Sequence, residues 1–120
     1  MNLQECYAAF GGDYDSVIDH IQSESIVHKF VLRFLDDKSY EKLVSAIESG
    51  NYEEAFAAVH TLKGVCLNLC FKRLSESTSG LTELLRNKSD DEVDRDKCLE
   101  ALEVIKKDYS DVVETIRKLS

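Results

Sequence analysis

Residues 51–71 read NYEEAFAAVHTLKGVCLNLCF, and a single helical pattern runs through all of them. When each residue is turned by about 100° from the last, small and apolar side chains gather on one side. Asn51 is the expected N-cap, and Glu54 stands three residues later at the capping-box position. The pattern therefore predicts one long helix, whose core face comprises Ala55, Ala58, Val59, Leu62, Val65, Cys66, Leu69 and Cys70.

His60 lies near the middle of the opposite face and is expected to point to solvent. Three large apolar residues, Phe56, Leu67 and Phe71, fall within about 40° of His60 on the same wheel. An outward face is normally charged, so apolar residues around one histidine indicate a binding site. They could instead be core residues if the helix were rotated or covered, and this alternative fits Phe71 best because it stands at the helix end.

Two neighbours of His60 suggest a chemical role for this face. Gly64 lies one turn later, where a glycine costs roughly 1 kcal/mol relative to alanine but leaves space beside the imidazole. Lys63 lies one turn away on the other flank and places an ammonium group near whatever the histidine holds. A neutral imidazole is a nucleophile, and a lysine can neutralise phosphoryl oxygens during transfer. This arrangement suits phosphoryl transfer to a histidine nitrogen.

The segment His60-Thr61-Leu62-Lys63-Gly64, followed by Asn68-Leu69, resembles the signature of histidine-containing phosphotransfer (HPt) domains. The resemblance implies a helical bundle that relays phosphoryl groups to and from aspartates of response-regulator receiver domains. A hybrid sensor histidine kinase is the other implied partner. By the same resemblance His60 accepts the phosphoryl group, Lys63 stabilises charge and Gly64 gives clearance. The residues expected to dock the partner are Phe56, Leu67, Asn68 and Phe71, although Asn68 could also bond a nearby backbone group.

The similarity covers most of the chain. Phe10-Gly11-Gly12-Asp13, Lys29-Phe30 and the segment 50–55 resemble parts that precede the histidine helix in stand-alone members. One departure is Cys70, where the family often has glycine, and it is expected to alter packing against a neighbouring helix. The resemblance also implies a monomeric phosphoryl carrier, not an enzyme, with no ATP-dependent kinase activity. No cofactor is expected on this chain, because Mg²⁺ would belong to the partner receiver.

Composition predicts one all-α domain over residues 1–120. The chain has no proline and only five glycines, and its apolar residues recur at helical spacing. A formal net charge of -8 argues against nucleic acid and anionic membranes as partners. No apolar run approaches the length of a membrane span and the first residues do not resemble a signal peptide, so a cytoplasmic location is expected. The four cysteines are then expected to be reduced.

The predicted fold is an antiparallel four-helix bundle with one or two short N-terminal helices. Residues 23–49 could form one bent helix or two helices with a break near Asp37. Ser89 and Glu92 fit a capping box for the last helix, which is expected to run to about Lys118. The two helical segments within residues 23–49 are residues 23–35 and 39–49. The other helices are expected over residues 3–10, 51–71 and 74–86, and a further one follows a cap at Asp13, with an apolar stripe from Tyr14 to Ile21.

Two other functions are compatible with these residues. The chain could be a non-catalytic protein-interaction bundle whose apolar face binds a partner while His60 is incidental. Cys66 and Cys70 share a helical face and could bind zinc with a histidine from elsewhere. Their position on the core side favours simple burial, so no metal site is expected. His20 and His28 are interpreted as ordinary surface residues.

Overall fold

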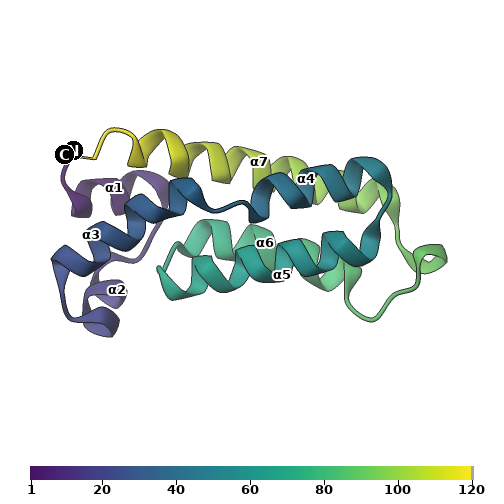
Figure 1. Cartoon of the computed structure of the whole chain (residues 1–120), viewed down its shortest axis with the longest axis horizontal. Helices are drawn as coiled ribbons and strands as arrows, with labels where there is room; N and C mark the ends of the chain where they lie inside the picture. Colours follow the sequence, from purple (N-terminus) through teal and green to yellow (C-terminus); the bar gives the residue numbers. More distant parts are fainter. Residues whose placement is uncertain (120) are drawn as a thin grey trace.

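The computed structural model describes residues 1–119 and is helical along nearly its whole length (Figure 1). No strand occurs within this range, so the prediction of an all-α fold is confirmed. The helices are α1 (Leu3–Phe10), α2 (Tyr14–Ile21), α3 (Glu24–Arg33), α4 (Ser39–Ser49), α5 (Tyr52–Asn68), α6 (Lys72–Leu85) and α7 (Arg95–Ile116), with 3₁₀ turns at Phe34–Asp36 and Asp90–Glu92.

Helices α4 to α7 lie side by side along the long axis, and successive helices run in opposite directions (Figure 1). Each packs on the next in the chain, and α4 also contacts α7. The three N-terminal helices gather at one end of the molecule, where α1 packs on the C-terminal part of α7. The first residue contacts the end of the chain's last turn there: the Met1 amino group donates a hydrogen bond to the Lys118 carbonyl at 3.0 Å.

Residues 23–49 form two helices joined by a tight turn. The Ser23 hydroxyl caps α3 by accepting from the Ile26 N–H at 3.3 Å. After the 3₁₀ turn, Asp37 adopts an extended backbone with ψ 134°, which interrupts the helix. Its carboxylate accepts a hydrogen bond from the Ser39 N–H at 2.8 Å and so supports the start of α4. The break therefore lies at the acidic pair that interrupts the apolar pattern.

The last helix is shorter than the sequence predicts. Ser89 and Glu92 do form a capping box, with the Ser89 N–H donating to the Glu92 carboxylate at 3.0 Å. This box closes only a 3₁₀ turn, because Val93 then returns to an extended backbone. Asp94 is the cap of α7, and its carboxylate accepts from the Lys97 N–H at 3.1 Å. The expected start of the helix at Ser89 is therefore wrong.

Helix α5 ends at Asn68, so its expected extension to Phe71 is also wrong. Two hydrogen bonds close the end: the Phe71 N–H donates to the Cys66 carbonyl at 2.9 Å, and the Cys70 N–H donates to the Leu67 carbonyl at 3.2 Å. Together they form a Schellman motif, whose left-handed residue is Cys70 with φ 56°. Cys70 is thus a turn residue and not a helical residue at the margin of the core face.

Helix α4 ends in the same way but with glycine. Gly50 has φ 73°, and bonds of the same spacing run from Asn51 to Ala46 at 2.8 Å and from Gly50 to Ile47 at 3.2 Å. A left-handed backbone costs roughly 1–2 kcal/mol for a residue with a Cβ and almost nothing for glycine. This geometry explains why glycine suits position 70.

We expect the Cys70→Gly substitution to raise the free energy of unfolding by about 1 kcal/mol, because it removes the cost of the left-handed backbone. Urea denaturation followed by circular dichroism measures the change. Cys70→Ala is the matched control, because it keeps the Cβ and the strain but removes the sulfur. A Cys70→Gly variant no more stable than Cys70→Ala would mean that packing, and not backbone conformation, governs this position.

The N-terminal segment holds the end of α5 in place. The buried Tyr7 hydroxyl donates a hydrogen bond to the Leu69 carbonyl at 2.7 Å. Burial raises the pKa of Tyr7, so its hydroxyl stays protonated and available as a donor. The Asp13 N–H donates to the Cys70 carbonyl at 2.8 Å, and the Arg73 N–H donates to the Gly11 carbonyl at 3.1 Å. Helix α1 and the turn after it therefore fix the direction in which α5 ends.

Candidate functional site

Helix α5 places His60 on its outer face. The predicted core face is buried at Ala55, Ala58, Val59, Leu62, Cys66 and Leu69 and half-buried at Val65 and Cys70. His60 is exposed, as the wheel predicts. At the start of the helix the Asn51 side chain accepts from the Glu54 N–H at 3.2 Å, which is the expected N-cap. Capping and amphipathic spacing thus orient the histidine before any partner is present.

The imidazole of His60 does not stand alone on this face. The ring of Phe56, one turn earlier, lies parallel to it, with 5.8 Å between ring centroids and 9° between planes. The guanidinium of Arg86, just beyond the end of α6, lies 5.6 Å from the centroid of the Phe56 ring. Arg86 is also paired with Glu83, with 3.2 Å between Nε and Oε1. A row of stacked groups therefore runs from α6 to the histidine.

Lys63 lies one turn from His60 and is half-buried. Within residues 1–119 its ammonium group takes part in no ion pair. A half-buried lysine whose ammonium group has no ion-pair partner is suited to meet an incoming anion. The geometry is therefore compatible with charge stabilisation beside the imidazole.

Gly64 leaves an open space next to His60. A Cβ built at this position would have no neighbouring atom within 4 Å. At Gly12, by contrast, a Cβ would lie 2.5 Å from Cδ2 of Tyr7, so close packing requires that glycine. Nothing inside the fold requires Gly64, although it lies in a helix interior where glycine costs about 1 kcal/mol. The free space faces outward, where a partner could use it.

The expected docking residues divide between the surface and the core. Leu67 is 56% exposed, Asn68 is exposed and Phe56 is half-buried. Phe71 is only 1% exposed, so the prediction that it lies on the outer face is wrong. The left-handed turn at Cys70 reverses the chain direction and carries Phe71 inward. The apolar outer face is therefore smaller at this end than the wheel suggests.

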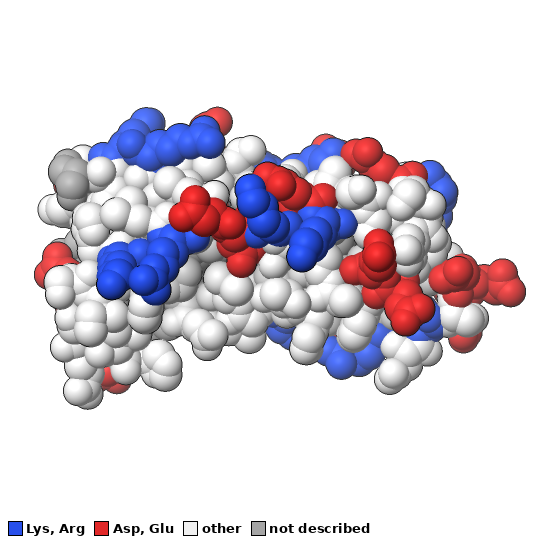
Figure 2. All heavy atoms as spheres, in the orientation of Figure 1, with Lys and Arg blue, Asp and Glu red and all other residues white. Residues whose placement is uncertain are grey.

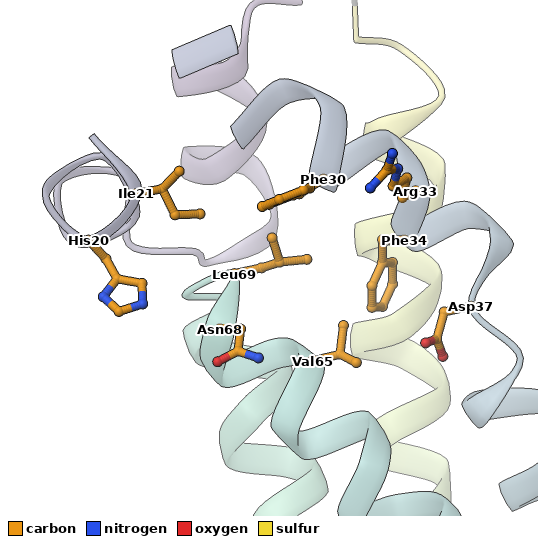
Figure 3. A pocket seen from close by; sticks show the side chains of 9 residues that line it. All are labelled: His20, Ile21, Phe30, Arg33, Phe34, Asp37, Val65, Asn68 and Leu69. Atoms are coloured by element: carbon orange, nitrogen blue, oxygen red, sulfur yellow. The ribbon is translucent and has the colours of Figure 1, made fainter. Parts of the chain in front are cut away.

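A pocket of about 430 Å³ lies beside the C-terminal half of α5 (Figure 3). In Figure 3 apolar side chains of Ile21, Phe30, Val65 and Leu69 point toward its centre, from α2, α3 and the end of α5. Polar groups stand around the edge, and Arg33 lies over the ring of Phe30 at 5.8 Å. The full lining, called here the α2–α5 pocket, is His20, Ile21, Phe30, Arg33, Phe34, Asp37, Val65, Asn68 and Leu69.

The charged side chains are unevenly distributed around this site. In Figure 2 acidic groups gather toward the end of the molecule formed by the α4–α5 and α6–α7 connections, and the surface over the middle of α5 is largely free of them. Such a surface can approach an acidic partner without strong repulsion.

The cysteines offer little for metal chemistry. Cys66 is fully buried, and burial raises the pKa of its thiol. Across residues 1–119 there is no cluster of three or more His, Cys, Asp or Glu side chains that could hold a metal ion.

In the same range no helix combines the length and the apolar character needed to cross a bilayer.

Several residues near the site are not indicated by the sequence pattern. Arg86 reaches Phe56 across thirty positions, and only the folded α5–α6 pair brings them together. Phe30 and Arg33 stand three residues apart on α3, a spacing that could have suggested their contact but not the pocket. His20 lines the pocket, although the sequence alone suggests an ordinary surface residue.

Comparison with known proteins identifies the family. The model of the Hpt domain matches residues 37–115, which run from just before α4 almost to the end of α7 and include His60, Lys63 and Gly64. No curated protein and no solved structure matches the chain. The match covers well over half of the chain, and the chain therefore belongs to the Hpt domain family, whose members carry phosphoryl groups on a histidine in phosphorelays and are not kinases.

Proposed function

We propose that this protein is a phosphoryl carrier in a two-component phosphorelay and that His60 is its phospho-accepting residue. The observation that carries the proposal is an exposed histidine with empty space one turn away, at a glycine that the fold itself does not need. No other histidine combines exposure with such a neighbour in the part of the chain described. The family assignment supplies the reaction class.

In the proposed step, the lone pair of an unprotonated ring nitrogen of His60 attacks the phosphorus of an aspartyl phosphate on a receiver domain. An N–P bond forms as the O–P bond breaks, and the electrons of the broken bond stay on the aspartate carboxylate. The reverse step returns the phosphoryl group to a second receiver. Phosphoryl transfer depends mainly on positioning and on charge stabilisation, so a carrier needs few chemical groups of its own.

Lys63 is the proposed source of charge stabilisation from this chain. Its unpaired ammonium group can approach the phosphoryl oxygens as negative charge shifts between them. Mg²⁺ and the acidic residues that bind it are assigned to the receiver. A hybrid sensor histidine kinase is the proposed source of phosphoryl groups, and the cytoplasm is the proposed place of action.

The proposed docking surface consists of Leu67, Asn68 and the α2–α5 pocket, with Phe56 on the other side of His60. It has an apolar centre with one cation, Arg33, and one carboxylate, Asp37, in its lining, which suits a receiver presenting apolar side chains. This surface uses α2 and α3, which lie outside the matched segment 37–115. We therefore propose that residues 1–120 act as one domain.

A transfer assay tests the function. A receiver domain charged with labelled phosphate is incubated with the protein and Mg²⁺, and the product is treated with acid and with base. The proposal expects label on this chain that is labile in acid and stable in base, as for a phosphohistidine. Absence of label from several receivers, combined with measurable binding to one of them, would favour the non-catalytic interaction bundle.

We expect Gly64→Ala to make the protein more stable and, at the same time, to slow phosphoryl transfer. The added methyl group contacts no other part of the chain, and alanine favours the helix more than glycine does. The free energy of unfolding should therefore rise by about 0.5–1 kcal/mol. The same methyl group fills the space beside His60 that a docked receiver would use. The rate of transfer from a receiver should therefore fall about tenfold or more, because a small displacement of the reacting groups lowers the rate strongly. Urea denaturation and the transfer assay measure the two effects.

Gly80→Ala is the matched control for this prediction. Gly80 also lies in a helix interior, is exposed and has no atom within 4 Å of a built Cβ. The Gly80→Ala substitution should stabilise the protein by a similar amount and leave the rate of transfer from a receiver unchanged. If Gly64→Ala transferred as fast as Gly80→Ala, clearance at Gly64 would have no role in docking.

A further inference from the structure

We propose that Arg86 is a positioning residue for His60 and that it acts through the ring of Phe56. This inference rests on the proposed function for its importance, but the physical coupling between the three side chains can be measured without any phosphoryl transfer. Arg86 follows the last residue of α6, whereas Phe56 and His60 belong to α5. The coupling therefore joins the end of one helix to the reactive group of another.

Arg86 is held in place by contacts other than the one with Phe56. Its backbone N–H donates to the Thr82 carbonyl at 2.9 Å, which ends α6. Its Nε–H donates to the Glu83 carboxylate at 3.2 Å, and its side chain is only 40% exposed. A guanidinium restrained in this way keeps its place over the Phe56 ring, 5.6 Å from the centroid.

The Phe56 ring transmits this restraint to His60. The two rings are almost parallel, with 9° between their planes and 5.8 Å between their centroids. Residues four apart on a helix face each other, so rotation of either ring disturbs the other. A cation over an aromatic face stabilises that ring in its orientation. Arg86 thus narrows the range of imidazole orientations on an otherwise exposed side chain.

A restrained imidazole matters for transfer, because the reacting nitrogen must meet the phosphorus in line with the leaving oxygen. Fewer orientations to search means that more of the bound population is ready to react. Lys63 has a different role, because it flanks His60 directly and can contact the phosphoryl oxygens. Arg86 is a positioning residue and is not expected to contact them.

The test uses four variants: Arg86→Gln, Arg86→Lys, Phe56→Leu and the double variant with Arg86→Gln and Phe56→Leu. Phosphoramidate serves as a small phosphoryl donor, so that docking of a receiver does not enter the rate. Arg86→Gln should lower the rate of His60 phosphorylation by about two- to fivefold, the size of a surface cation–π contact. Arg86→Lys should restore most of the rate, and adding Arg86→Gln to Phe56→Leu should lower it no further.

Side-chain NMR of the unphosphorylated protein gives a second readout that a general loss of stability would not change. The His60 ring proton shifts should move in Arg86→Gln, should move further in Phe56→Leu, and should be the same in the double variant as in Phe56→Leu. Lys88→Gln is the control for altered surface charge, because it removes an exposed cation two residues after Arg86, and it should leave the rate unchanged. Unfolding midpoints should stay close to that of the wild type in Arg86→Gln, because its side chain is partly exposed.

An undiminished effect of Arg86→Gln in the Phe56→Leu background would overturn the proposal and indicate that Arg86 acts on the phosphoryl group directly. Unchanged His60 shifts in Arg86→Gln would also overturn it. The proposed function fails in a different way, if wild-type His60 takes label neither from receivers nor from phosphoramidate. In that case the NMR shifts still decide whether Arg86 orients the imidazole through Phe56.

Discussion

Replacing His60 by Gln is expected to abolish phosphoryl acceptance, with a loss of more than about a thousand-fold, because removal of a nucleophile is the most damaging single change in group transfer. Glutamine resembles histidine in size and polarity but offers no nucleophilic nitrogen. It is a good helix former, and the position is exposed, so the free energy of unfolding should change by less than about 0.5 kcal/mol. The labelled receiver assay measures the loss, and circular dichroism checks the fold.

Two other histidines provide controls for this experiment. His20→Gln and His28→Gln should both accept label from phosphoramidate at the wild-type rate, because neither residue lies beside His60 on α5. His20→Gln can in addition slow transfer from a receiver, since His20 lines the α2–α5 pocket. Equal labelling of His60→Gln and wild type would show that the nucleophile is elsewhere. Binding of a receiver to His60→Gln with normal affinity would separate docking from chemistry.

The three candidate residues of α5 could be placed beside one another from the sequence, because they lie within about one helical turn. His60, Lys63 and Gly64 share a face whatever α5 packs against, since the spacing of the helix alone determines their relation. The same reasoning located α4, whose predicted limits of residues 39 and 49 agree with the structure. Gly50 marks its end with a residue whose backbone preference is plain in the sequence.

The wrong limits predicted for α5 and α7 come from sequence features that are compatible with either a continuing helix or a turn. Cys70 adopts the left-handed conformation that glycine usually adopts at a helix end, so no glycine in the sequence marks the end of α5. Ser89 and Glu92 form the expected box, but their hydrogen bonds are satisfied by a 3₁₀ turn and the helix starts at Arg95. Local hydrogen bonding is readable from the sequence, but whether the chain continues as a helix depends on tertiary packing.

The groups that α5 meets from other helices could not be predicted. Arg86 reaches the site through the crossing of α5 and α6, and the α2–α5 pocket requires the end of α5 to lie under α2 and α3. No periodicity in one segment contains that information. The sequence therefore specifies which residues of α5 share its outer face, but not where the chain turns after Asn68 or what other helices place beside that face. Phe71 is the residue at which this difference has the largest energetic consequence.

Phe71→Ala is expected to lower the free energy of unfolding by about 3–5 kcal/mol, the range for removing a buried Phe side chain. The Phe71 ring lies 5.6 Å from Tyr7, 4.9 Å from Phe10 and 5.2 Å from Phe34 between centroids, so its loss leaves a cavity among three aromatic rings. A small domain is stable by only about 5–15 kcal/mol, so this single change removes much of the total. Urea denaturation followed by circular dichroism measures it.

Phe30→Ala is the matched comparison for Phe71→Ala. Phe30 is 39% exposed on α3 and lines the α2–α5 pocket, so its removal should cost less than about 1.5 kcal/mol but weaken binding of a receiver. The helical wheel of residues 51–71 predicts the opposite for Phe71, namely a small loss of stability and a large loss of binding. The pair of variants therefore distinguishes a helix that continues through Phe71 from one that turns at Cys70. If Phe71→Ala stayed as stable as wild type and bound receivers poorly, the inward turn at Cys70 would be wrong.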